Sequence, residues 1–198
     1  MQIKANQDTG RKIMMHRMWK YLSFIILFSF VFPNGNQFTF TGSNETHSTI
    51  SLQSSTEIRQ VIDGYSRIAK EGEGHTTDLG FPELPTYTTF YQLDPQKVYR
   101  YELEIIDSYI IDNIKVIPHQ GISSKWEVNK ISELSSEYYL SNVGYPAQNL
   151  VVSDRMPGRG IEIISIQVTP YIYHPTEQKL EVFNHVNIHI IELSLIHI

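Results

Sequence analysis

Apolar and polar residues alternate along several stretches of this chain, and this alternation limits the possible fold more than any other sequence feature. It is clearest in residues 98–105, 161–168 and 182–190, where alternate positions carry mainly Tyr, Leu, Ile or Val. A period of two places neighbouring side chains on opposite faces of a strand. These segments are therefore predicted to be β-strands, each with one buried face.

Residues typical of tight turns separate the predicted strands. They occur at Asp63-Gly64, Leu93-Asp94-Pro95, Asp112-Asn113, Gly144-Tyr145-Pro146, Met156-Pro157-Gly158 and His174-Pro175-Thr176. Short strands between frequent turns are typical of an all-β protein. The predicted fold is an antiparallel β-sandwich of jelly-roll type, and only Ser132–Leu140 indicates a helical turn.

The last strands are expected to form a hairpin. In it Gly160–Tyr173 pairs antiparallel with Lys179–Ile191 around the turn at His174-Pro175-Thr176. Pro170 has no backbone N–H to donate, so it is expected near a strand end, where the ring of Tyr173 folds over it.

The N-terminus has the layout of a secretory signal peptide, assigned to residues 1–35. A basic stretch, residues 11–20, precedes the apolar run Leu22–Phe32, which ends at Pro33-Asn34-Gly35. The run is shorter than the roughly 20 residues of a membrane-spanning helix, so stable membrane insertion is not expected, although a membrane anchor remains the alternative. The signal peptide implies contact with export machinery and a secreted or cell-surface location.

The rest of the chain divides by composition. Residues 36–56 are polar and are expected to form a flexible linker or a first strand, residues 57–193 form the sandwich, and residues 194–198 look like an artefactual tail of a fragment. The chain carries a net charge of −5, and residues 35–198 have 11 basic against 20 acidic side chains, which argues against a nucleic-acid partner. Cysteine is absent, which excludes disulfides, thiolate metal sites and a cysteine nucleophile from this chain.

No arrangement of residues indicates catalysis, a cofactor or a bound metal. His185 and His189 have the spacing of zinc ligands on a helix, but they fall on a predicted strand, where both face solvent. His119 and His174 are interpreted as turn residues.

Two other patterns have enzymatic alternatives. Glu102, Glu104 and Asp107 could be a glycosidase carboxylate set, but their positions are those of a solvent-facing strand edge. The Gly72-Glu73-Gly74 stretch lacks the third glycine and the helix of a phosphate-binding loop, and is interpreted as a flexible acidic loop.

Three segments carry more specific motifs. The first is Gly80-Phe81-Pro82-Glu83-Leu84-Pro85, which leads into a strand predicted at Thr86–Gln92. The second is Gly144-Tyr145-Pro146, followed by Leu150-Val151-Val152-Ser153. The third runs from Arg159-Gly160 through an alternating strand to Pro170-Tyr171-Ile172-Tyr173-His174-Pro175 and returns in Leu180-Glu181-Val182-Phe183. In this order, they resemble the propeptide domain of the gingipain family of secreted cysteine peptidases.

The resemblance implies a β-sandwich prodomain that precedes a caspase-like catalytic domain, keeps it latent, assists its folding and is removed by proteolysis. Known carriers are Bacteroidetes that export through the type IX route. The partner that the resemblance implies is the chain's own downstream peptidase domain. This chain does not contain that domain, so the resemblance assigns no catalytic residue to it. The chain itself is therefore not expected to be an enzyme. The matching residues are expected to be structural: Gly80, Pro82, Leu84, Pro85, Pro146, Arg159, Gly160, Pro170, Tyr173 and Pro175.

The segment Gly121–Glu137 is the longest without period-two alternation, and long connections are often functional. Lys125 and Lys130 are its basic residues and Trp126 lies beside Lys125, so these three are predicted to contact the peptidase cleft. The alternative is that the lysines keep a surface loop soluble.

A secreted binding or adhesion module for carbohydrate or protein is the alternative for the whole chain. It would need exposed aromatic residues, and the one cluster available is expected to be mostly core: Tyr87, Phe90, Tyr91, Tyr99 and Tyr101.

Overall fold

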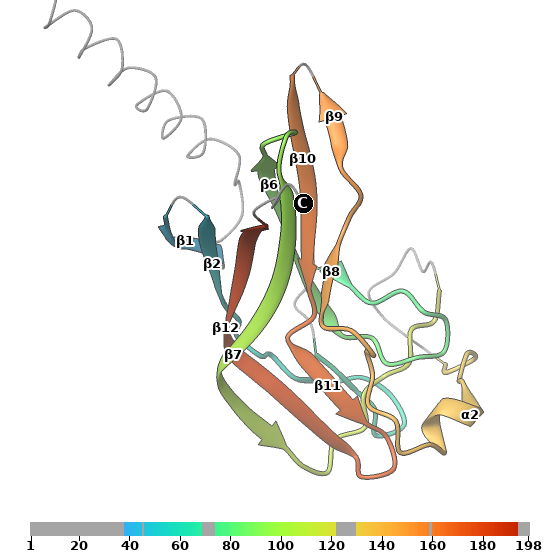
Figure 1. The fold of residues 1–198 in the computed structure, drawn as a ribbon. Helices are drawn as coiled ribbons and strands as arrows, with labels where there is room; N and C mark the ends of the chain where they lie inside the picture. The colour runs from blue at the N-terminus through green and yellow to red at the C-terminus, as the bar shows by residue number, and fades with distance from the viewer. Residues whose placement is uncertain (1–37, 45, 69–73, 122–129, 159, 194–198) are drawn as a thin grey trace, which may run out of the picture. The chain divides into compact units, whose positions relative to one another are not determined.

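Two antiparallel sheets contain most of the residues that the computed structural model describes, which are 38–44, 46–68, 74–121, 130–158 and 160–193 (Figure 1). The first sheet has the order β1 (Phe38–Ser43), β2 (His47–Gln53), β12 (Lys179–Leu193) and β11 (Tyr171–His174), with β7 (Val98–Ile111) also paired to β12. The second has the order β5 (Gly74–His75), β6 (Pro85–Leu93), β10 (Ile161–Val168) and β8 (Leu150–Val152), with β9 (Met156–Gly158) also paired to β10. A small ribbon pairs β3 (Arg59–Gln60) with β4 (Ser66–Arg67).

The core lies between the two sheets. Alternate residues of β12 and of β10 are buried and belong to one hydrophobic cluster: Leu180, Val182, Val186, Ile188, Ile190, Ile164, Ile166 and Val168. Leu52 of β2 and Tyr87 and Leu93 of β6 join the same cluster. The predicted all-β sandwich is therefore confirmed, because β10 and β12 each bury one face of their alternating patterns against a shared core.

β12 is the central strand of the first sheet. β7 pairs with it from Leu180 to Leu193, while β11 and β2 pair with its first and second halves. Figure 1 shows β7 as a long curved strand beside β12. The β7 pairing shifts register between Phe183 and Val186, and at this irregularity Phe183 is buried although it is out of phase with the other core residues.

The predicted hairpin is wrong in its first strand. β10 pairs with β6, β8 and β9 in the second sheet, and only β11 pairs back on β12, from Tyr171 opposite Val182 to His174 opposite Lys179. The chain changes sheets at Pro170, which has no N–H to continue the ladder and whose carbonyl accepts a hydrogen bond from the N–H of Phe183 at 2.9 Å.

Two further expectations fall within the described residues. Residues 38–53, assigned from sequence to a linker or a first strand, form β1 and β2. The helical turn expected in Ser132–Leu140 is confirmed as α2 (Ser136–Tyr139). The signal peptide at 1–35 and the tail at 194–198 lie outside the described residues.

Candidate functional site

Both ends of the predicted contact segment are described, and one side chain joins them. The Gln120 side-chain oxygen accepts hydrogen bonds from the N–H groups of Ser132 at 2.8 Å and Glu133 at 3.1 Å. Its amide nitrogen donates to the carbonyls of Pro118 and Glu133, both at 2.8 Å. We call residues 118–121 and 132–135, together with Gly80, the loop base.

Gly80 holds the two sides of the loop base together through its backbone. Its N–H donates to the carbonyl of His119 at 2.9 Å, and its own carbonyl accepts from the N–H of Ser135 at 3.0 Å. Its φ is +77°, and a Cβ added there would lie 2.8 Å from the Ser135 nitrogen. The first glycine of the family motif is thus required by both backbone conformation and close contact.

The remainder of that motif runs alongside the start of the loop base. The N–H of His119 donates to the carbonyl of Phe81 at 2.7 Å, and the N–H of Glu83 donates to that of Ile117 at 2.8 Å. Pro82 forms a β-bridge with Pro118. Leu84 and Pro85 are buried at the start of β6, so the motif connects the loop base to the second sheet.

An aromatic cluster, Phe81, Tyr138, Tyr139, Tyr145 and Tyr173, packs beside the loop base. The ring centroid of Phe81 lies 5.0 Å from that of Tyr138 and 5.3 Å from that of Tyr145. The hydroxyl of Tyr138 donates to the carbonyl of Tyr173 at 2.9 Å, and that of Tyr139 donates to the carbonyl of Val116 at 3.1 Å. Burial raises the pKa of Tyr173 to about 12 and raises the pKa of Tyr138 and Tyr139 further. The two tyrosines of α2 therefore fix the end of the segment against the sandwich.

Buried charges gather around His119 of the loop base, which the sequence analysis interpreted as a turn residue. The Arg67 guanidinium contacts Oε1 of Glu83 at 2.7 Å, and Nδ1 of His119 lies 3.5 Å from Oε2 of the same carboxylate. All three side chains are buried, and His75 lies beside them with its ring centroid 5.2 Å from that of His119. The interpretation of His119 as a plain turn residue is wrong, because it closes a charged cluster that no local spacing could reveal.

Of the three residues predicted to contact the peptidase, the structure describes one. Lys130 is exposed at the returning end of the segment, whereas Lys125 and Trp126 lie outside the described residues, as does the motif residue Arg159. Gly160 has a φ of +84° at the start of β10, and Pro170 and Pro175 are buried at the two ends of β11. Pro146 follows Tyr145, whose backbone exchanges hydrogen bonds with that of Tyr173 at 3.0 and 2.8 Å.

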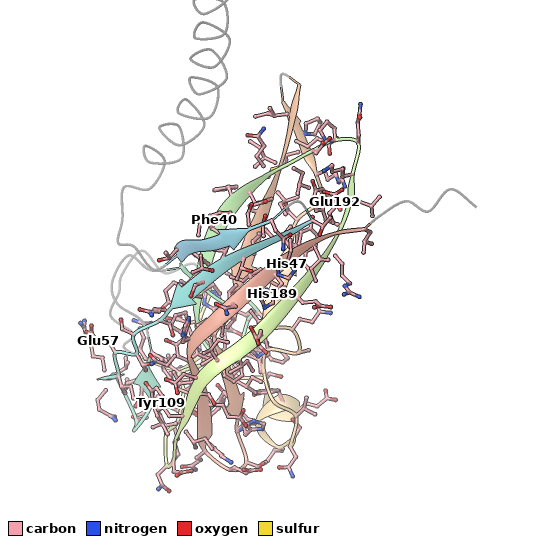
Figure 2. The ribbon with its side chains drawn as sticks, turned by 60° about the vertical axis from the view of Figure 1, so that its left-hand side comes forward. Phe40, His47, Glu57, Tyr109, His189 and Glu192 are labelled. Atoms are coloured by element: carbon pink, nitrogen blue, oxygen red, sulfur yellow. The ribbon has the colours of Figure 1, made fainter. Side chains whose placement is uncertain are left out.

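His185 and His189 do not simply face solvent as predicted. His189 contacts Nε2 of His47 through Nδ1 at 3.0 Å and Oε2 of Glu104 through Nε2 at 3.0 Å, and Nε2 of His185 contacts Oγ of Ser51 at 2.7 Å. Figure 2 shows His47 and His189 side by side on β2 and β12. These contacts form a polar ladder on the face opposite the core.

The other residues considered as sites from the sequence do not form a catalytic or binding site within the described part of the chain. Glu102, Glu104 and Asp107 are exposed on β7, as predicted for a solvent-facing edge. Gly72 and Glu73 lie outside the described residues. Of the five aromatic residues considered for an adhesion surface, Tyr87 is buried, Tyr91, Tyr99 and Tyr101 are half-buried, and Phe90 alone is exposed. They do not make an exposed aromatic row.

Comparisons with known proteins agree with this arrangement. The model of the family Propeptide_C25 matches residues 48–193. A solved complex of the pro- and mature domains of Porphyromonas gingivalis RgpB is similar with a TM-score of 0.64 and 16% identity, covering 81% of this chain and 86% of that one. A structure described as giving insight into the zymogenic latency of gingipain K from Porphyromonas gingivalis has a TM-score of 0.62 and 17% identity, covering 82% and 96%.

At these identities the structural likeness concerns the fold. A search of curated proteins finds no match. In the described part of the chain, no helix has the length and apolarity needed to cross a membrane.

Proposed function

The chain belongs to the propeptide family of C25 peptidases, and from this premise we propose that it keeps a gingipain-like cysteine peptidase latent, assists its folding and is then removed by proteolysis. The match over residues 48–193 carries the proposal, since it covers the second sheet, the loop base and the first sheet apart from β1 and the first residue of β2. The two similar structures, a complex of pro- and mature domains and a study of zymogenic latency, support the same role.

The loop base supports the segment Gly121–Glu137 as the inhibitory element. Gln120 and Gly80 bring its two ends together, and α2 anchors the returning end through buried tyrosines. A rigid base lowers the entropy lost when the segment that it carries binds in a cleft. We infer that Lys125 or Lys130 enters an acidic specificity pocket of the peptidase, while Trp126 supplies apolar contact.

Inhibition in trans tests the inhibitory role. The Lys125→Ala variant should inhibit the cognate gingipain-like peptidase about 10-fold more weakly than the unchanged chain, which corresponds to about 1.4 kcal/mol. Its melting temperature should not change. Lys115→Ala is the matched control, because Lys115 is an exposed lysine outside the segment and should inhibit as the unchanged chain does.

One result would contradict the role of the segment, and another would contradict the role of the whole chain. Equal inhibition by the unchanged chain and by a Lys125→Ala, Lys130→Ala double variant would exclude the segment as the inhibitory element and leave the lysines as solubilising residues. A chain that binds no gingipain-like catalytic domain would favour a binding or adhesion module instead.

Propeptides of this family belong to secreted or cell-surface peptidases. We infer that residues 1–35 direct export across the inner membrane and that the parent protein then follows the type IX route. N-terminal sequencing of exported protein would locate the leader's end and reveal a product that retains it.

A further inference from the structure

Two histidines and a glutamate converge at the loop base, to which His119 itself belongs. His75 belongs to β5, Glu83 precedes β6, and His119 follows β7. Each offers one ligand atom, and the three atoms lie within 4.8 Å of one another. Glu83 and His119 are buried, whereas His75 is half-buried and connects the cluster to the surface.

We propose that His75, Glu83 and His119 bind a divalent transition-metal ion, with Zn²⁺ the best fit and water as the fourth ligand. Imidazole nitrogen and carboxylate oxygen are zinc ligands, and bonds of about 2.0–2.2 Å in a tetrahedron place ligand atoms about 3.3 Å apart. Nδ1 of His119 is already 3.5 Å from Oε2 of Glu83. Small rotations of the half-buried His75 side chain would complete the arrangement.

The backbone that carries the three ligands is cross-linked before any ion binds. His75 pairs with Pro85 in the second sheet. The N–H of Glu83 donates to the carbonyl of Ile117, and the N–H of His119 donates to that of Phe81. Binding therefore requires little ordering of the chain, which lowers its entropic cost.

Arg67 supports this role for Glu83. Its guanidinium contacts Oε1 at 2.7 Å, which fixes the carboxylate plane and leaves Oε2 directed at His119. Hydrogen-bonding partners of this kind commonly orient a metal-binding carboxylate. The charge of Arg67 also balances that of Glu83, so the buried carboxylate is stable in the absence of an ion.

The polar ladder on the first sheet shows what a convergent site requires. His189 approaches His47 with Nδ1 and Glu104 with Nε2, from opposite sides of its ring. One ion cannot bind both nitrogens of one imidazole, so His47, Glu104 and His189 cannot all bind one ion through these contacts. The ligand atoms of His75, Glu83 and His119 do converge on one position. The polar ladder therefore provides a histidine control.

A bound ion would brace the loop base, because His119 directly precedes Gln120, whose side chain joins both ends of the contact segment. An ion that binds only the folded chain stabilises it. At a zinc concentration 100-fold above the dissociation constant, the melting temperature should rise by about 5–10 °C.

The test is titration of the untagged chain with Zn²⁺ at neutral pH by calorimetry, repeated with Co²⁺ to record the visible spectrum of a four-coordinate site. We expect one ion per chain. The His75→Ala variant should weaken binding by at least about 100-fold, since even an outer partner of a ligand is worth 10- to 100-fold. It should also abolish the rise in melting temperature. The His189→Ala control should bind as the unchanged chain does.

His75 is half-buried on a short edge strand, so its replacement should preserve the fold, which circular dichroism checks. The His119→Gln variant is a second test, because it keeps a polar side chain in the buried position. Absence of zinc binding, or equal affinity in the His75→Ala variant and the unchanged chain, would overturn the proposal. Loss of binding only in His189→Ala would assign the ion to the polar ladder and overturn it equally.

Discussion

Gly80 meets two separate demands that other residues cannot meet together. Its φ of +77° is in the left-handed region, and its α-carbon approaches the backbone of Leu134 and Ser135 too closely for a side chain. Gly64 has nearly the same φ, +78°, but a Cβ added there meets nothing within 4 Å. A comparison of Gly64 with Gly80 therefore separates the cost of the left-handed conformation from the cost of steric contact.

Replacing each glycine by alanine should give different losses of stability. Gly64→Ala should lower the free energy of unfolding by about 1 kcal/mol, the cost of a left-handed conformation. Gly80→Ala should lower it by at least about 2 kcal/mol, because the loop base must also move away from the new methyl group. Urea denaturation measures both values, and equal losses would show that the close contact has no energetic weight.

Among the elements, β2 determines how far the chain can be shortened from its N-terminus before the fold is lost. It pairs with β12 from His47 to Gln53 and contributes Ile50 and Leu52 to the core, with Leu52 fully buried. The polar composition of residues 36–56 conceals this role, since half of a strand's residues face away from the core.

A chain shortened to residues 57–198 should therefore fail to fold, while one shortened to 46–198 should fold. Loss of a buried Leu or Ile side chain costs about 2–5 kcal/mol, and two such losses approach the typical total stability of a domain. The shorter chain also leaves unpaired those N–H and C=O groups of β12 that pair with β2. Far-ultraviolet circular dichroism and urea denaturation compare the two, and identical unfolding midpoints would show β2 to be dispensable.

At the scale of the whole molecule, tyrosines join parts of the sandwich that are distant in sequence. Tyr145 bonds Asp78 through its hydroxyl at 2.7 Å, and Tyr173 bonds the carbonyl of Ile114 at 3.1 Å. Burial raises the pKa of Tyr145, Tyr138 and Tyr139 above the ordinary value of 10.0, and that of Tyr173 to about 12. These groups remain protonated in the folded chain well after unfolded tyrosines ionise.

The fold should accordingly be lost in alkali. Above about pH 10 the unfolded chain releases tyrosine protons that the folded chain retains, so the free energy of unfolding falls by about 1.4 kcal/mol per pH unit for each buried tyrosine. The stabilisation is complete below pH 10 and disappears as the pH passes the raised pKa values. The part of the tyrosinate absorbance that comes from the buried tyrosines should appear together with the loss of β-structure seen by circular dichroism. Ionisation of all the tyrosines of the chain while the β-structure stays intact would contradict this prediction.

Local patterns in the sequence identify the strands and the family. The alternation in residues 98–105, 161–168 and 182–190 predicts β7, β10 and β12, because the side chains of a strand divide between two faces whatever its neighbours are. The motif from Gly80 to Pro85 is equally local, since a positive φ and the missing N–H of proline constrain their own residues.

Strand partners and buried charges depend instead on residues far apart along the chain. β10 alternates as well as β12 does, and nothing in its own residues indicates that it pairs with β6 rather than returning on β12. Arg67, His75, Glu83 and His119 become neighbours only when β4, β5 and the ends of β6 and β7 are packed together. Local spacing identifies the strands here, whereas their pairing and the charged cluster at the loop base follow from the combined packing of both sheets.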